Sequence, residues 1–178
     1  MKKTELFNIN VSDTFKVGGI EFIKFNQNGD KVTAVAKDIV FNSEFGSDND
    51  FAKSKVLKRL EEEILPRIAD EIGMDNIFDI TTDLTTLDGL KPYDEMTSKI
   101  SLPTFDFYRA NVAIFDKYKV NKWWWLATPD TAQPHYNPTW IVCVSPNGGI
   151  SNDYYNYYDC GVRPLLIFNS SIFVSCEE

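Results

Sequence analysis

Residues 151–159 are the segment of this chain that is best equipped to bind another molecule. They read Ser-Asn-Asp-Tyr-Tyr-Asn-Tyr-Tyr-Asp and hold four of the protein's eight tyrosines. Tyrosine offers a large, stiff contact area with one hydrogen-bonding tip, while asparagine and serine add adaptable polar contacts, as in antibody binding loops. The predicted contact residues of this segment are Asn152, Asp153, Tyr154, Tyr155, Asn156, Tyr157, Tyr158 and Asp159.

A second stretch of the same character contains His135, Tyr136 and Asn137, in a polar loop that runs from Asp130 to Asn137. We expect these residues to lie beside residues 151–159 and to complete one contact face. The alternative interpretation is an exposed hairpin in which the tyrosines pack across strands and bind nothing.

Catalysis by a Ser-His-Asp or Cys-His arrangement would have to use His135, which is the only histidine. A proline-bracketed polar loop suits surface contact better than an oriented base, so we expect no catalytic residue and a protein that is not an enzyme. Cys143, Cys160 and Cys176 are odd in number and form no CxxC pair. This pattern argues against a disulfide framework or a zinc site and favours free thiols in a reducing compartment.

The elements that position these residues come in the order strands, helices, strands. Residues 14–41 alternate apolar and polar side chains and carry the hairpin signal Asn28-Gly29. Towards the other end of the chain, residues 140–144 predict a buried strand and residues 172–174 predict a final buried strand.

The main helix is predicted over residues 49–72, where apolar side chains recur at three- and four-residue spacing. We expect Asp48 or Asn49 to cap this helix, Pro66 to kink or divide it, and Gly73 to end it.

Residues 74–103 are irregular and predict a long loop with a short strand near residues 100–102. Thr104 then predicts the cap of a second, short helix that runs through Val112.

Composition excludes several classes of protein. The chain has 178 residues with 43% hydrophobic and 14% aromatic content, which predicts one folded domain with a core over about residues 14–174. A net charge of −8 without a basic run argues against a nucleic-acid partner. The apolar runs fall far short of the ~20 residues that cross a bilayer, so we expect no membrane insertion. Because the N-terminus lacks a continuous apolar stretch, we expect synthesis in a cytoplasm without a signal peptide, with a place in a virion as the alternative destination.

Three ordered motifs resemble a family of uncharacterised bacterial and phage domains. They are Trp-Trp-Leu-Ala-Thr-Pro at 124–129, Val-Ser-Pro-Asn-Gly-Gly at 144–149 and Gly-Val-Arg-Pro-Leu-Leu at 161–166. The resemblance covers most of residues 14–168. That family is similar to the C-type-lectin fold used by formylglycine-generating enzymes and by the variable proteins of phage diversity-generating retroelements. The resemblance implies an α+β, C-type-lectin-like fold in which two helices pack on small antiparallel sheets and a loop-rich face binds the ligand, and the order of the elements agrees with this class.

The same motifs contain the residues that we expect to be structural, namely Trp124, Trp125, Gly161, Arg163 and Pro164. One tryptophan of residues 123–125 must point outward, because neighbours on a strand face opposite sides. Gly161 allows a positive φ or a close backbone approach, and Arg163 requires a carboxylate or several carbonyls as partners.

The resemblance also raises two cofactor questions. Calcium-dependent lectins of this fold use a proline-centred loop and a later Asn-Asp pair; here the loop is Gln133-Pro134-His135 and the pair is Asn152-Asp153. Because His135 stands where an acidic ligand is wanted, we expect no calcium and no other cofactor. Formylglycine-generating enzymes need two cooperating cysteines, and only a coincidence of strand pairing would bring Cys143 and Cys160 together.

We therefore expect a non-catalytic ligand-binding protein, encoded by a phage or prophage, that recognises a protein or a glycan. Retroelement-diversified proteins mutate at adenines, and adenine changes in an Asn codon reach Tyr, Asp, Ser, Cys, Gly and His, the palette of residues 151–160 and 135–137. Two alternatives stay open. The first is an assembly protein whose tyrosines form a homo-oligomer interface, and the second is a degenerate enzyme of the formylglycine-generating type.

Overall fold

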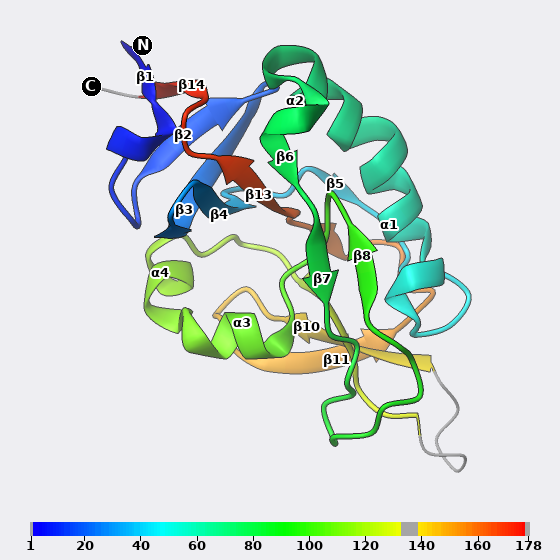
Figure 1. Cartoon of the computed structure of the whole chain (residues 1–178). Coiled ribbons are helices and arrows are strands. Elements are labelled where there is room, and N and C mark those ends of the chain that lie inside the picture. The colour runs from blue at the N-terminus through cyan, green and yellow to red at the C-terminus, as the bar shows by residue number, and fades with distance from the viewer. Residues whose placement is uncertain (1, 133–138, 177–178) are drawn as a thin grey trace.

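A computed structural model describes residues 2–132 and 139–176 of the chain and shows an α+β fold built mostly of antiparallel sheet (Figure 1). The larger sheet has seven strands. Their spatial order is β1 (Lys2–Glu5), β14 (Phe173–Cys176), β2 (Thr14–Val17), β3 (Ile20–Asn28), β4 (Lys31–Ala36), β13 (Leu165–Asn169) and β6 (Ile77–Phe78). The α+β class predicted from the order of the elements is confirmed.

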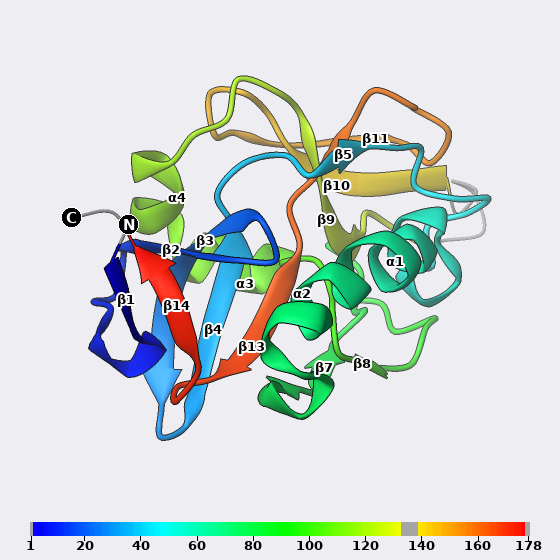
Figure 2. The same cartoon turned by 90° about the horizontal axis from the view of Figure 1, so that it is seen from above.

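A second sheet of five strands positions the predicted contact residues. Its order is β11 (Ile150–Tyr154), β10 (Trp140–Val144), β9 (Trp124–Pro129), β12 (Gly161–Val162) and β5 (Phe41–Asn42), and only the β12–β9 pair is parallel. Figure 2 shows this sheet along the top of the view with the larger sheet below it. Because β1 pairs with β14, the two ends of the chain lie together, on the opposite side of the molecule from β11.

The predicted main helix is divided into four parts. They are a 3₁₀ turn η2 (Phe51–Lys53), α1 (Lys55–Arg59), a π-helical turn η3 (Leu60–Ile64) and α2 (Leu65–Ile72). Pro66 is the second residue of α2, directly after the π turn gives way to the α-helix, in agreement with the predicted division, and Gly73 ends the helix with φ 83°. The predicted caps Asp48 and Asn49 are wrong.

The helix begins later than predicted because two other polar side chains satisfy its first amides. Asp50 Oδ1 accepts a hydrogen bond from Ala52 N and caps η2, and Ser54 Oγ accepts one from Leu57 N and caps α1. Asn49 is left for a different role, described below.

The region predicted as a long loop contains short strands that the sequence did not indicate. After η4 (Met74–Asn76) come β6, β7 (Ile80–Thr82) and β8 (Met96–Ser98), whereas the strand predicted near residues 100–102 is only an isolated bridge from Ser101 to Leu165. Strands of two or three residues carry no period of their own, and β6 finds its partner β13 far along the chain. Two further elements at the N-terminus, β1 and η1 (Leu6–Asn8), were likewise not indicated.

Other local predictions are confirmed or need adjustment. The hairpin between β3 and β4 turns at Gly29, which has φ 63°. Thr104 Oγ1 accepts from Phe107 N and caps α3 (Phe105–Ala110), and a further short helix, α4 (Val112–Lys117), follows. The final strand is β14, but its Phe173 is 62% exposed, so this strand is not buried throughout.

The core consists of two apolar clusters that meet at β9. Trp125 belongs to the cluster that includes Phe22 and Leu60, while Trp124 belongs to the cluster that includes Phe115 of α4. Trp123 is 38% exposed and is therefore the outward-facing member of the three tryptophans. One tryptophan is exposed, as predicted, but Trp123 precedes β9; the alternation along the strand instead sends Trp124 and Trp125 into opposite core clusters.

Candidate functional site

The tyrosine-rich segment begins on β11, the edge strand of the five-stranded sheet. Successive side chains alternate along this strand, so Asn152 and Tyr154 are exposed while Asp153 is half-buried. The antiparallel register places Tyr154 opposite Trp140 and Asn152 opposite Val142. On one face of this sheet, α3 and α4 cover β9 and β10. The same face of β11 is open to solvent.

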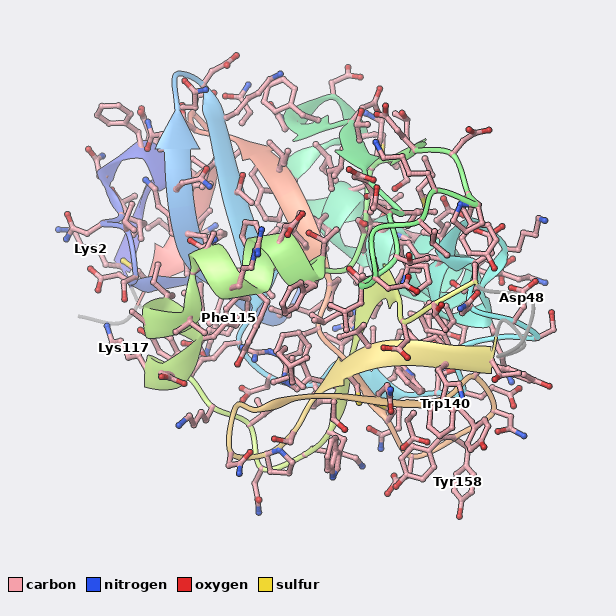
Figure 3. All side chains as sticks on the ribbon, turned by 90° about the horizontal axis from the view of Figure 1, so that it is seen from below. Lys2, Asp48, Phe115, Lys117, Trp140 and Tyr158 are labelled. Carbon is pink, nitrogen blue, oxygen red and sulfur yellow. The ribbon has the colours of Figure 1, made fainter. Side chains whose placement is uncertain are left out.

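A pair of aromatic rings, half-buried Trp140 and exposed Tyr154, marks this open edge. The rings of Trp140 and Tyr154 lie with their centroids 3.9 Å apart and their planes 34° apart, and Tyr154 is 49% exposed. Tyr158, in the turn that follows β11, is 77% exposed. Figure 3 shows Trp140 and Tyr158 at the same edge of the molecule, with Lys2 and Lys117 at the opposite edge. We call Trp140, Tyr154 and Tyr158 the aromatic face.

The other two tyrosines of the segment anchor it. Tyr155 and Tyr157 are half-buried and pack against the larger core cluster. The carbonyl of Tyr155 accepts hydrogen bonds from Phe45 N at 2.7 Å and from Gly46 N at 3.3 Å, and its amide donates to the carbonyl of Thr139. The four tyrosines are thus divided between anchoring the turn and facing solvent.

Polar groups surround the aromatic face. Asn152 Nδ2 donates to Asp130 Oδ2 at 3.1 Å, and Thr131 Oγ1 donates to Asp88 Oδ2 at 2.7 Å. Burial raises the pKa of Asp130, the hydrogen bond from Asn152 opposes this shift, and the charge of Asp88 adds to it. Asn156 and Asp159 are exposed, and Asp159 pairs with Lys122 (Nζ to Oδ1 2.8 Å). The carboxylate of Asp130 is therefore held partly out of water beside the backbone of Trp140, whose carbonyl accepts from Asp130 N.

A cavity of about 250 Å³ lies beside Thr128, near the end of β9. It lies between α3 and the loop after β7, and its walls include Thr85, Thr86, Phe105 and Thr128. The hydroxyl of Thr128 accepts a hydrogen bond from Phe105 N at 2.8 Å. Thr128 precedes Asp130 by two residues, so the cavity adjoins the end of β9 that leads to Asp130.

A buried amide that sequence reasoning assigned to a helix cap holds this region together. Asn49 is fully buried, and its Nδ2 donates to the carbonyls of Thr131 at 2.9 Å and Trp140 at 3.2 Å. Its Oδ1 accepts from the hydroxyl of Tyr93 at 2.5 Å. The role of Asn49 left no signal in the sequence, because all of its partners are distant along the chain.

The predicted contact residues His135, Tyr136 and Asn137 lie outside the described residues.

Sequence reasoning also missed Trp140, which was expected to be buried with the rest of its strand. The first residue of β10 is half-buried, whereas the next four are buried. The sequence could have indicated that Trp140 pairs with Tyr154 only if the register between β10 and β11 had been known.

The residues expected to be structural lie in the core. Arg163 is 1% exposed, and its Nε donates to the carbonyl of Ala36 at 3.0 Å. Its guanidinium lies 4.8 Å from the ring of Trp124 and 5.6 Å from that of Phe115. The partners of the guanidinium are thus the Ala36 carbonyl and two aromatic rings, in place of the expected carboxylate or set of carbonyls. Burial lowers the pKa of Arg163 to about 10, and the charge of Asp38 opposes this shift. The neighbouring Pro164 contributes its carbonyl, which accepts from Ala36 N.

Gly161 provides the close approach that was one of its two expected roles. An added Cβ would overlap the Cδ1 atom of Ile39 and lie 2.9 Å from its Cγ1. This space is available only to glycine while Ile39 keeps its position.

Cys143 and Cys160 are buried free thiols, and Cys176 is a half-buried free thiol. Burial raises the pKa of Cys143 to about 12 and raises that of Cys160. Within residues 2–132 and 139–176, no three His, Cys, Asp or Glu side chains gather in a way that could hold a metal ion. No helix in this part of the chain is long and apolar enough to cross a membrane.

Comparison of the chain with family models, with curated proteins and with solved structures finds no match.

Proposed function

We propose that this chain is a non-catalytic ligand-binding protein that holds a protein or a glycan against its aromatic face. The observation that carries the proposal is the close ring pair formed by half-buried Trp140 on β10 and exposed Tyr154 on the edge strand β11, with exposed Tyr158 in the turn that follows. Exposed Trp and Tyr rings are unusual on a surface that only meets water and are enriched where proteins bind partners. Ring stacking and hydrogen bonding hold a ligand without breaking any bond in it.

The anchoring of the segment supports the proposal. A binding face loses less conformational entropy when its parts are already fixed before the ligand arrives. Here β11 is paired with β10, the Tyr155 carbonyl is held by two amides, and Tyr157 N donates to the Tyr154 carbonyl at 3.0 Å. The exposed rings of Tyr154 and Tyr158 thus project from a backbone that hydrogen bonds already hold in place.

We further propose the C-type-lectin-like form of the α+β fold, as a domain encoded by a phage or prophage. The ordered motifs at 124–129, 144–149 and 161–166 support this proposal, because they form β9, the turn between β10 and β11, and the β12–β13 connection, all of which build or adjoin the five-stranded sheet. In such a fold the ligand binds on a loop-rich face, and the aromatic face lies away from the paired termini.

Alanine substitution tests the proposed function directly. The test compares the wild-type protein with Trp140→Ala/Tyr154→Ala and with Tyr158→Ala, all screened on a glycan array and on arrayed bacterial surface proteins. Phe173→Ala and Phe7→Ala remove rings that are 62% and 61% exposed and lie near the termini, so they serve as matched controls. We expect the face variants to lose every specific ligand and the controls to keep it. Folded face variants that keep all binding would overturn the proposal.

Light scattering separates a ligand face from a subunit interface. If the wild-type protein forms a stable oligomer that Tyr154→Ala and Tyr158→Ala dissociate, the tyrosines are an assembly contact instead.

Sequencing the DNA around the gene tests whether the tyrosine-rich segment is diversified by a retroelement. A second near-copy of the stretch that encodes residues 130–160, differing only at adenines, supports a retroelement-diversified face, and an invariant segment without such a copy supports one fixed partner.

A further inference from the structure

The sheet that carries the aromatic face is built without a single basic residue. Residues 123–162 contain no lysine and no arginine, whereas they contain Asp130, Asp153 and Asp159. This stretch supplies β9, β10, β11 and β12. Lys122, which precedes it, is already engaged by the Asp159 carboxylate at 2.8 Å.

The loop that flanks the aromatic face has the same sign of charge. The loop between β7 and β8, residues 83–95, contains Asp83, Asp88, Asp94 and Glu95 against one basic residue, Lys91. Asp88 reaches the face through its hydrogen bond from Thr131, and its charge raises the pKa of Asp130. Two carboxylates therefore lie close together beside the Trp140 backbone, in a protein whose net charge is −8.

We propose that the partner of the aromatic face is a protein segment that presents arginine, whose guanidinium stacks on the Trp140–Tyr154 pair and pairs with Asp130. This proposal rests on the proposed function and deepens it by naming the chemistry of the partner. A ring face attracts a cation, and a planar guanidinium both stacks on a ring and binds a carboxylate in a fork. An acidic surface also steers a basic partner towards it and repels acidic ones.

Within the described residues the protein places an arginine over an aromatic ring at three positions, one of which is Arg109 over Phe105. The Arg59 guanidinium lies 4.0 Å from the ring of Phe41 in β5, and the Arg163 guanidinium lies 4.8 Å from the ring of Trp124 in β9. Both rings belong to the five-stranded sheet that carries Trp140. At the aromatic face the rings and carboxylates are present, and within residues 2–132 and 139–176 no arginine lies over these rings. An arginine is thus the complement that a partner would bring.

The test measures the affinity of the full chain for octa-arginine, octa-lysine and octa-glutamate peptides by isothermal titration calorimetry. A general attraction between an acidic protein and a basic peptide would treat arginine and lysine alike. We expect octa-arginine to bind about fivefold more tightly than octa-lysine because only guanidinium stacks well on the pair, and we expect no binding of octa-glutamate. Affinity for octa-arginine should fall at least about tenfold between about 50 and 500 mM NaCl.

Variants assign the preference to named groups. Trp140→Ala/Tyr154→Ala should reduce the arginine preference to less than about twofold, while Tyr154→Phe, which keeps the ring, and Phe173→Ala should retain it. Asp130→Asn should weaken octa-arginine binding about threefold, and Asp106→Asn, which removes an exposed carboxylate paired with Arg109, should not.

Equal affinity for the two basic peptides, or a preference that persists without the rings, would overturn this inference. Ring-dependent, salt-insensitive binding of an uncharged oligosaccharide such as maltoheptaose would overturn it as well and would leave the proposed function standing. Ligand binding that survives removal of the rings is the one result that would contradict both the proposed function and this inference.

Discussion

The side chain of Asn49 donates a hydrogen bond to the backbone carbonyl of Trp140 at 3.2 Å, although 91 residues separate the two in sequence. The same amide donates to Thr131 and accepts from Tyr93. One buried side chain in the segment before η2 therefore connects three parts of the chain: the loop before β8, Thr131 just after β9, and Trp140 at the start of β10. The position of the Trp140 ring against Tyr154 depends on this connection, because Trp140 begins β10.

Asn49→Ala should be strongly destabilising. It removes three hydrogen bonds to part-buried groups, the carbonyls of Thr131 and Trp140 and the hydroxyl of Tyr93, although the Trp140 carbonyl keeps the bond from Asp130 N. A buried group that loses its partner costs about 1–3 kcal/mol. After relaxation we expect the free energy of unfolding to fall by roughly 3 kcal/mol, measured by urea denaturation. Asn152→Ala is the matched control, since it removes an exposed amide with one hydrogen bond and should cost less than about 0.5 kcal/mol. Equal losses in the two variants would show that the amide of Asn49 holds nothing together.

Tyr93 makes stability depend on alkaline pH. Burial, and then the charges of Asp48 and Asp50, raise the pKa of its hydroxyl to about 12. Between pH 10 and 12 the folded state keeps a proton that the unfolded state has released, so this contribution to stability is complete below pH 10 and is lost as the pH rises. We expect Tyr93→Phe to flatten the decline of the unfolding free energy over this window by roughly 1 kcal/mol, allowing for solvent screening. Parallel declines in the variant and the wild-type protein would contradict this assignment.

The sequence predicted the elements whose period or end signals are local. Residues 49–72 repeat apolar side chains over several turns, and Gly29, Gly73 and Thr104 act within one turn of their own position. The α+β class follows from the order of these elements. By contrast, β6, β7 and β8 are too short to show a period, and they form because distant strands offer them hydrogen bonds.

The candidate site was predictable in composition but not in geometry. The tyrosine-rich segment is visible in the sequence, yet only the alternation along β11 and the turn after it separates the exposed Tyr154 and Tyr158 from the anchoring Tyr155 and Tyr157. The pairing of Trp140 with Tyr154 depends on a strand register, which a sequence without a known register does not contain.

Thiol reactivity should distinguish the three cysteines. Thiolates are the reactive form, and burial raises the pKa of Cys143 and Cys160, whereas Cys176 lies half-exposed near the chain end. With Ellman's reagent at about pH 8, we expect one thiol to react in the native protein and all three in urea. Cys176→Ser should abolish the fast native reaction. Rapid reaction of a second native thiol would mean that the core around Cys143 or Cys160 opens readily.

Gly161→Ala should create a clash that a second substitution relieves. The new methyl group overlaps Ile39, so we expect a loss of about 1–3 kcal/mol in the free energy of unfolding. Ile39→Ala removes the atoms that the methyl group meets. The double variant should therefore be at least about 1 kcal/mol more stable than the sum of the single losses predicts.

The control for this cycle is Gly149→Ala, whose added Cβ meets only the side chains of Ser145 and Asn147. The effect of Gly149→Ala should simply add to that of Ile39→Ala, because Ile39 is not among the side chains that the new Cβ at position 149 would meet. If Gly161→Ala also adds to Ile39→Ala, then Gly161 is required for the backbone of β12 itself, where it pairs with Trp124 and Asn42, and the space beside Ile39 is incidental.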